Sequence, residues 1–314
     1  MNTVLTSSPE KAAAFIRAGD VVAFPTETVY GLGADSFNPD AVEKIFEAKG
    51  RPQDNPLIVH VANLGQIEGL AADVTDTGWR LIDRFFPGPL TIILRRHPDV
   101  PSIVTAGLDT VGIRMPSHPV AQEFLTACDT PVAAPSANLS GRPSPTSWQT
   151  VHANLNGRIS CILKGGRTDV GIESTVLDCS RRTPMVLRAG GVTLEDLQEI
   201  VPRTRMADEI PDRPLSPGQV HRHYVPNASV QLVSHPSEAQ PSASAAFIGL
   251  DAPSNGAAFG LTRMCESKEA YAHELFDFFY ECDRLDMETI YCQKVDEKGL
   301  GRGLMDRLLR AAQR

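Results

Sequence analysis

The residues best suited to chemistry are concentrated in residues 25–60, which read PTETVYGLGADSFNPDAVEKIFEAKGRPQDNPLIVH. If the segment 25–30 is extended, the side chains of Thr26, Thr28 and Tyr30 project to one side, because side chains alternate along a strand. Three hydroxyl groups followed directly by two glycines predict a polar pocket wall with room for a ligand.

Two cations, Lys49 and Arg51, flank Gly50 at the predicted end of a helix that is capped by Asn38. A Lys-Gly-Arg sequence at a helix end is usually a solvated cap whose charges complement the helix dipole. His60, in the apolar strand LIVHV, is by itself more typical of a hydrogen-bonded core residue. The density of hydroxyls, glycines, cations and one imidazole in a single βαβ-sized unit instead favours an anion-binding site.

Later segments supply the same kinds of side chain, with hydroxyls at Ser136, Ser144 and Ser174 and guanidinium groups at Arg114 and Arg188. Guanidinium forks suit both carboxylates and phosphates, so a site made from Lys49, Arg51, Arg114 and Arg188 is able to hold a phosphate chain and a carboxylate together. The sequence contains no Walker A motif, GxSxG, HExxH or ordered Ser-His-Asp set, and no side chain stands out as a nucleophile. The pattern therefore favours catalysis by orientation and electrostatic stabilisation.

Composition limits the classes of protein to which the chain can belong. Its 314 residues, 42% hydrophobic and 22% charged, predict two globular domains. The net charge of −8 argues against a generally basic nucleic-acid surface, so any RNA contact would be weak and local. The six cysteines show no CxxC or Cys/His spacing, which favours a reducing cytosol over disulfides or zinc. No secretory or membrane-spanning pattern occurs, so we expect a soluble cytoplasmic protein without membrane contact.

Helix and strand patterns mix without regular alternation in the first part of the chain, which predicts a twisted, mixed-sheet α/β domain over residues 1–205. A proline-rich linker is expected over 206–228 and a smaller α/β, Rossmann-like domain over 229–314. The GLGRG turn before the last helix fits neither Walker A nor the dinucleotide fingerprint, so a structural role is favoured over phosphate binding. Helices are expected over residues 9–18, 76–86, 119–127, 146–154, 267–285 and 301–314, with strands over 244–250, 256–261 and 288–292 in the last domain.

Longer motifs occur in an order that resembles the YrdC-like threonylcarbamoyl-AMP synthases. They are PTETVYGLG, the KGR triplet, NPLIVHV, PGPLTIIL, GIRMPSHP, APSANLSGRPSPT, ESTV and LRAG. The linker SPGQVHRHYVP and the extra C-terminal domain resemble the long, two-domain form of that family. The resemblance is dense over residues 25–188. In the linker the chain departs from it, with Gln-Val-His at residues 219–221 where the family often has Met-Lys-Tyr.

The resemblance implies a nucleotidyltransferase, an L-threonylcarbamoyladenylate synthase. Such an enzyme joins L-threonine, bicarbonate or CO2 and ATP into threonylcarbamoyl-AMP and releases pyrophosphate. The product supplies a downstream tRNA threonylcarbamoyl transferase, which modifies adenosine 37 of tRNA. Mg²⁺ is expected to accompany ATP, although no carboxylate cluster in the sequence indicates a metal site built by the protein.

By motif position, the resemblance also implies roles for individual residues. The catalytic cations would be Lys49 and Arg51. L-Threonine would be bound by Thr28, His60, Arg114, the backbone of Ala134 and Ser174. ATP would be bound by Arg51, Asn55, Thr110, Ser136, Ser144, Arg188 and Tyr224, with His223 as the alternative contact from a linker that closes over the site.

Two other functions fit parts of the sequence. A non-catalytic RNA-binding module of the same fold would present a positive concave surface, but the net acidity and the density of small-ligand groups count against it. A different carbamoyl transfer occurs in hydrogenase maturation proteins that contain a related domain. Those chains are much longer and carry zinc-finger and acylphosphatase-like modules, of which this sequence shows nothing.

Overall fold

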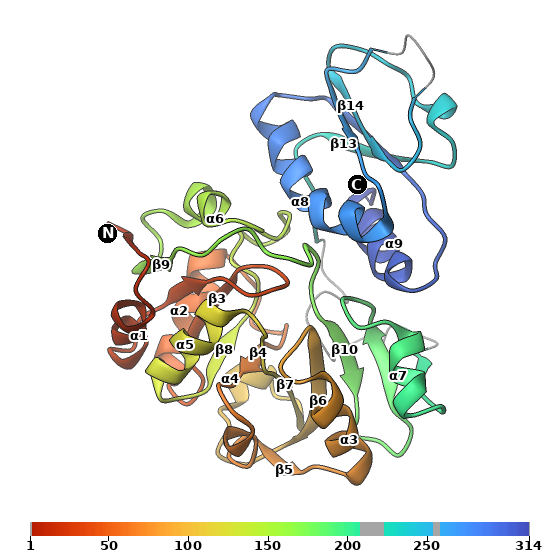
Figure 1. Cartoon of the computed structure of the whole chain (residues 1–314). Helices are drawn as coiled ribbons and strands as arrows, with labels where there is room; N and C mark the ends of the chain where they lie inside the picture. Colours follow the sequence, from red (N-terminus) through yellow and green to blue (C-terminus); the bar gives the residue numbers. More distant parts are fainter. Residues whose placement is uncertain (1, 208–222, 254–257, 314) are drawn as a thin grey trace.

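The computed structural model describes residues 2–207, 223–253 and 258–313, and Figure 1 shows a larger and a smaller α/β unit. The larger unit is built on a mixed sheet and the smaller one on a parallel sheet, which confirms the predicted fold class. The prediction of a linker over 206–228 falls mostly outside the described residues. Within the described ranges, no helix is long and apolar enough to cross a membrane.

The large sheet has the strand order β1-β9-β2-β3-β8-β4-β7-β6-β10-β11-β12, with β5 paired to β6. Its parallel and antiparallel pairs alternate irregularly, as expected from the mixed sequence pattern. The strands are β1 (Val4–Thr6), β2 (Val22–Phe24), β3 (Gly31–Asp35), β4 (Ile58–His60), β5 (Ala71–Asp73), β6 (Leu90–Arg96), β7 (Thr110–Arg114), β8 (Val132–Ala134), β9 (Cys161–Leu163), β10 (Thr175–Asp178), β11 (Met185–Arg188) and β12 (Arg205–Met206).

Seven α-helices cover this sheet in the described part of the chain. They are α1 (Pro9–Arg17), α2 (Pro39–Lys49), α3 (Asp76–Phe85), α4 (Ser102–Thr105), α5 (Pro119–Cys128), α6 (Trp148–Leu155) and α7 (Leu194–Ile200), and a 3₁₀ turn spans Leu64–Ile67. The Asn38 side chain accepts a hydrogen bond from the Ala41 amide, and Gly50 ends α2 with φ 61°. Both predictions for the ends of α2 are therefore confirmed, and this helix presents its last turn to the site.

Two local predictions were wrong. Residues 25–30 are not extended, because the Thr26 hydroxyl accepts hydrogen bonds from the amides of Thr28 and Val29 and donates to the Val29 carbonyl at 2.7 Å. Such side-chain bonds to the local backbone compete with a strand. Helix α6 is capped by Ser147 and begins at Trp148, two residues after the start of the helix predicted over 146–154.

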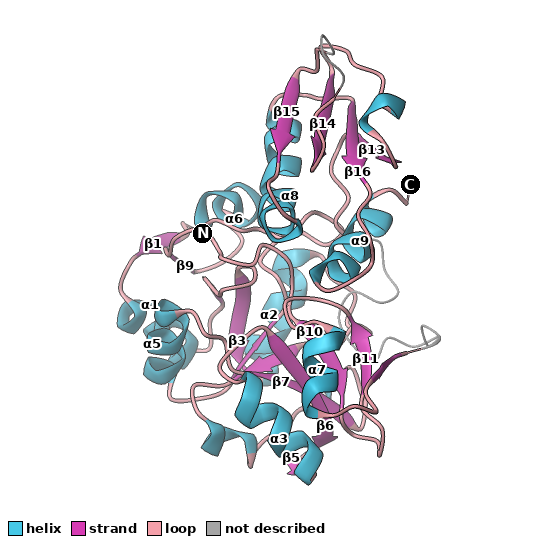
Figure 2. Cartoon of the chain, turned by 45° about the vertical axis from the view of Figure 1, so that its right-hand side comes forward, coloured by secondary structure: helices cyan, strands magenta, loops and turns pink. Residues whose placement is uncertain are grey.

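The small sheet has the order β13-β16-β14-β15, and all of its neighbouring strands are parallel (Figure 2). Its elements are β13 (Ser229–Val233), a 3₁₀ turn (Pro236–Glu238), β14 (Ala245–Gly249), β15 (Leu261–Met264), α8 (Lys268–Arg284), β16 (Thr289–Gln293) and α9 (Leu300–Ala311). The strand predicted over 256–261 lies several residues later, at β15. Residues 254–257 are outside the described ranges.

The two units share a hydrophobic core. Helices α8 and α9 lie between the small sheet and the larger unit (Figure 1), and their apolar side chains form one cluster with Val29, Ile172 and Tyr224. Gly171, with φ +81°, lies against α8 so closely that an added Cβ would be 2.4 Å from the Cα of His273. This close approach brings α8 and α9 over the polar loops of the larger unit.

Candidate active site

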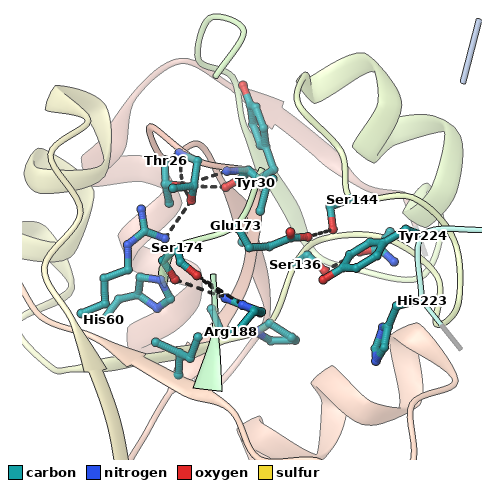
Figure 3. A pocket seen from close by; sticks show the side chains of 18 of the residues that line it. Thr26, Tyr30, His60, Ser136, Ser144, Glu173, Ser174, Arg188, His223 and Tyr224 are labelled. Atoms are coloured by element: carbon teal, nitrogen blue, oxygen red, sulfur yellow. Dashed lines mark hydrogen bonds between the residues drawn. The ribbon is translucent and has the colours of Figure 1, made fainter. Parts of the chain in front are cut away.

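A cavity lies at the edge of the large sheet where three parallel strands end. β4, β7 and β11 run in the same direction, as their pairings with each other and with β6 and β10 require. Each ends in a basic residue that lines the cavity: His60, Arg114 and Arg188. The carboxyl ends of strands thus concentrate positive or hydrogen-bonding groups at one place (Figure 3).

Most of the predicted site residues line this one cavity. They are Thr28, Arg51, His60, Arg114, Ala134, Ser136, Ser144, Ser174, Arg188 and Tyr224. They come from loops and strand ends that are far apart in the sequence, and the fold brings them together. Three predicted residues are not among its lining: Lys49, Asn55 and Thr110.

Arg114 is held in place by groups behind the cavity. Its Nη1 donates to the Thr28 hydroxyl at 2.8 Å, and its Nη2 lies 2.8 Å from a carboxylate oxygen of Glu27. Both members of the ion pair have side chains only 5% exposed. A buried ion pair of this kind fixes the guanidinium plane. The Glu27 carboxylate also compensates the buried charge of Arg114.

His60 is the neighbour of Arg114 on the adjacent strand. Burial, and then the nearby Arg114 charge, lower the pKa of His60 to about 3. Its ring meets the Phe24 ring edge-on, with 5.6 Å between the ring centroids. The imidazole is therefore neutral at physiological pH and offers a hydrogen bond, not a charge, to a ligand.

Arg188 and Ser174 form the opposite side of the cavity. Arg188 donates from Nε and Nη2 to the Ser174 carbonyl at 3.2 and 2.9 Å, and the Ser174 hydroxyl lies 2.8 Å from that of Thr91. Burial lowers the pKa of Arg188, yet a guanidinium keeps its charge at neutral pH. These contacts hold a cation and a hydroxyl on one rigid wall.

The two cations at the end of α2 have different environments. Arg51 lines the cavity and donates to the carbonyls of Asn55 and Pro56 at 3.3 and 3.2 Å, and burial lowers its pKa to about 10. Lys49 instead donates from Nζ to the carbonyls of Ser136 and Asn138. Burial, followed by the Arg51 charge, lowers the Lys49 pKa well below its usual value. Lys49 thus holds the backbone of the 136–138 loop in position and does not line the cavity.

Asn55 and Thr110 lie outside the cavity for different reasons. Asn55 is buried, and its backbone carbonyl contributes to holding Arg51. Thr110 begins β7 while Arg114 ends it, and four residues of strand span roughly 13 Å. Their predicted contacts with ATP stay predictions.

Tyr224 lies in the cavity wall with its backbone in the left-handed region, at φ 67°. Its ring stacks on Phe276 of α8 with 5.2 Å between centroids. His223 beside it also lines the cavity, and burial followed by the Arg51 charge lowers its pKa to about 3. The end of the predicted linker therefore reaches the site.

Glu173 and Arg142 line the cavity but were not predicted from the sequence, and Glu173 has contacts that reach the smaller unit. Glu173 accepts a hydrogen bond from the Ser144 hydroxyl and pairs with Arg307 of α9 at 2.9 Å. Arg307 was missed as well, although it interrupts the apolar face of α9 between Leu304 and Ala311. A charged residue at a buried helical position was the available signal. In the part of the chain that is described, no group of three or more His, Cys, Asp or Glu is arranged to hold a metal.

The fold and the cavity define a class of protein: an α/β protein whose neutral imidazole and converging arginines are suited to two anionic ligands side by side. Two family models match the chain. Residues 14–190 match the Sua5, YciO and YrdC family, described as telomere recombination, and residues 192–313 match the threonylcarbamoyl-AMP synthase C-terminal domain.

Individual relatives are similar in sequence over nearly the whole length of this chain. The chain is 41% identical to threonylcarbamoyl-AMP synthase of Pyrococcus abyssi, covering 96% of this chain and 93% of the relative, and 40% identical to that of Bacillus subtilis, covering 98% and 94%. It is similar to the crystal structure of P. abyssi Sua5 complexed with L-threonine, with a TM-score of 0.89 at 39% identity over 99% of this chain and 97% of that one. The chain belongs to the Sua5/YrdC family of threonylcarbamoyl-AMP synthases.

Proposed function

We propose that this chain joins L-threonine, bicarbonate or CO2 and ATP into threonylcarbamoyl-AMP and pyrophosphate. The observation that carries the proposal is the convergence of Arg51, Arg114 and Arg188 with the neutral His60 in one cavity. The full-length similarity to threonylcarbamoyl-AMP synthases, and to a relative solved with L-threonine, supports it.

L-Threonine is placed at the Arg114 side of the cavity. The guanidinium, already oriented by Glu27 and Thr28, binds the amino-acid carboxylate. His60 and the hydroxyls of Thr28 and Ser174 hydrogen-bond the polar side chain and the amino end, with the Ala134 backbone beside them. The neutral imidazole adds selectivity without adding charge.

ATP is placed along Arg51, Ser136, Ser144, Arg188 and Tyr224, on the other side of the cavity. The arginines contact the phosphates, which are the charged part of the nucleotide. The Ser144 hydroxyl already donates its one hydrogen bond to Glu173, so toward the ligand its oxygen can only accept a hydrogen bond. It therefore suits an amine or hydroxyl of the nucleoside better than a phosphate oxygen.

The reaction requires two anions to approach one another. Threonine's amine first takes up CO2 and loses a proton to form a carbamate. One carbamate oxygen then attacks the α-phosphorus, and the bond from that phosphorus to the departing pyrophosphate breaks. Arg51 screens the repulsion between carbamate and phosphates, while Lys49 positions the 136–138 loop.

Mg²⁺ would enter with ATP. Mg²⁺ prefers hard oxygen ligands. Glu173 has the one carboxylate among the described cavity-lining residues, and it already pairs with Arg307 and accepts a hydrogen bond from Ser144. The donor set therefore fits an ion held by phosphate oxygens and water and not one held by the protein. The adenylate product would pass to a tRNA threonylcarbamoyl transferase.

Pyrophosphate release tests the proposal. Complete reactions with L-threonine, bicarbonate and ATP should release pyrophosphate, and omission of any one of the three should abolish it. Arg181→Ala is a suitable control variant, because that side chain is 65% exposed and outside the cavity lining. Pyrophosphate release that does not depend on threonine would contradict the proposal.

A further inference from the structure

The cavity contains one negative charge that is out of place beside a polyanion. Glu173 is the only acidic side chain among the described residues that line it, and four arginines line it as well. Its side chain is 9% exposed, so water does little to screen it. An uncompensated carboxylate here would repel the phosphates of a nucleotide.

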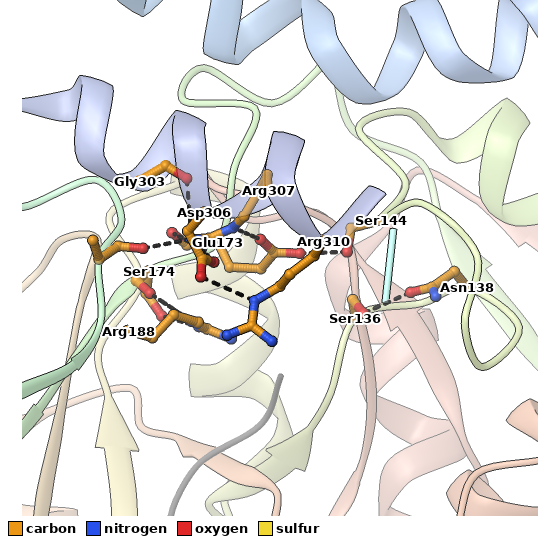
Figure 4. A network of polar contacts seen from close by, with 11 residues as sticks. Ser136, Asn138, Ser144, Glu173, Ser174, Arg188, Gly303, Asp306, Arg307 and Arg310 are labelled. Carbon is orange, nitrogen blue, oxygen red and sulfur yellow. Dashed lines mark hydrogen bonds and ion pairs between the residues drawn. The ribbon is translucent and has the colours of Figure 1, made fainter. Parts of the chain in front are cut away.

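The compensating charge comes from the smaller unit. Arg307 of α9 has a side chain that is 0% exposed, and its Nε lies 2.9 Å from Oε2 of Glu173 (Figure 4). Its Nη1 donates to the Ala189 carbonyl at 2.6 Å, directly after Arg188. Asp306 is 3.0 Å away on the same helix. Burial by itself raises the pKa of Glu173, but Arg307 and then Arg188 outweigh it, and the pKa is lowered.

Two glycines allow the close packing that brings Arg307 of α9 to Glu173. An added Cβ on Gly303 would lie 3.2 Å from the Gly190 amide nitrogen, and one on Gly190 would lie 2.3 Å from the Glu173 carbonyl oxygen. α9 therefore packs with its backbone close to that of Gly190, two residues after β11 ends at Arg188. Arg307, one turn after Gly303, then faces Glu173. The last glycine of the GLGRG sequence is accounted for by this close packing, and Gly301 lies as closely against the Asp296 carbonyl, which agrees with the structural role that was favoured from the sequence.

We propose that Arg307 is a positioning residue of the active site, supplied by the C-terminal domain. It neutralises Glu173 and fixes that carboxylate toward Ser144, so the nucleotide subsite is complete only when α9 is docked. The inference rests on the proposed function, because it assumes that ATP occupies this side of the cavity. It gives the C-terminal domain a direct part in nucleotide binding.

The test separates charge from packing with four variants of the full chain: Arg307→Gln, Glu173→Gln, the double variant, and the control Arg302→Gln. Arg302 is on the same helix and pairs with Glu195 of the larger unit at 3.5 Å, but it is not among the cavity-lining residues. ATP and L-threonine binding are measured separately by titration calorimetry, and circular dichroism reports folding.

Arg307→Gln should raise the Kd for ATP by about tenfold or more, because it leaves a buried carboxylate unpaired, while the Kd for threonine stays within about twofold. Adding Glu173→Gln should restore ATP binding to within about threefold of wild type, because the repelling charge is gone. Glu173→Gln alone should bind ATP at least as tightly as wild type. Arg302→Gln should behave as wild type toward both ligands.

A structural role alone predicts a different result, in which both ligands weaken together and the double variant is no better than the single one. That result, or an unchanged ATP affinity in Arg307→Gln, overturns the inference. If Arg307→Gln does not fold, Glu173→Gln decides, since weaker ATP binding there also overturns it. Wild-type chain that binds no ATP would instead refute the proposed function, and the inference with it.

Discussion

His60 and Arg114 occupy paired positions on β4 and β7, two adjacent parallel strands that end at the cavity. Neighbouring strands are about 4.8 Å apart, so a neutral imidazole and a guanidinium extend from adjacent backbone positions. Glu27 and Thr28 hold the guanidinium from behind. We propose that this pair recognises threonine.

Arg114→Lys should raise the KM for L-threonine by about 10- to 100-fold, because lysine keeps the charge but loses the planar fork that bonds two oxygens at once. Steady-state pyrophosphate release at varied threonine measures the effect. The KM for ATP in the same variant is the internal control and should change little. Equal increases in both KM values would argue against a threonine-specific role for Arg114.

Arg51→Ala should keep the fold and lose turnover by about 10²-fold, as expected if one cation stabilises the transition state by ~3 kcal/mol. Arg51 bonds only backbone carbonyls of its own loop among its described hydrogen bonds, so its removal leaves the sheet intact. Circular dichroism checks that the fold is kept, and pyrophosphate release measures the loss of turnover. Near-normal turnover would remove Arg51 from the mechanism.

Lys49→Met should act differently from Arg51→Ala, because Lys49 braces the loop at Ser136 and Asn138 and does not line the cavity. We expect a raised KM for ATP with a smaller change in kcat, as a displaced Ser136 weakens nucleotide binding. Kinetics at varied ATP distinguish the roles. A large fall in kcat at unchanged KM would restore Lys49 as a catalytic cation.

Local signals in the sequence were sufficient for some features and not for others. Asn38 and Gly50 were predicted correctly as the ends of α2, since a cap depends on neighbours within one turn. The turn at Thr26 was missed because its side chain competes for the backbone bonds that a strand would use. The alternation that suggested a strand therefore did not decide the conformation.

Some features of the candidate site could likewise be predicted from the sequence, and others could not. The order of the sequence motifs was enough to name ten site residues that line one cavity in the structure, although their positions in the sequence lie far apart. The pairing of Glu173 with Arg307 joins residues 134 positions apart across two units, and no local rule connects them. Only the docking of α9, allowed by the Gly190 and Gly303 contact, makes them neighbours.

Buried His60 should also make the stability of the protein depend on pH. Its pKa is about 3 when folded against 6.5 as the ordinary value, so between these values the unfolded chain binds more protons. Stability therefore falls as pH falls through this window. Replacing His60 with Gln removes the titrating group and should reduce the slope between pH 6 and 5 by about 1 kcal/mol per pH unit.

Urea denaturation of wild type and His60→Gln at several pH values measures this slope. His152→Gln is measured beside it as a second histidine replacement, on α6 and outside the cavity lining. His223, whose pKa is also lowered to about 3, should account for part of the slope that remains in His60→Gln. Identical slopes for wild type and His60→Gln would mean that the folded and unfolded states protonate this imidazole equally, and the lowered pKa of His60 would then be wrong.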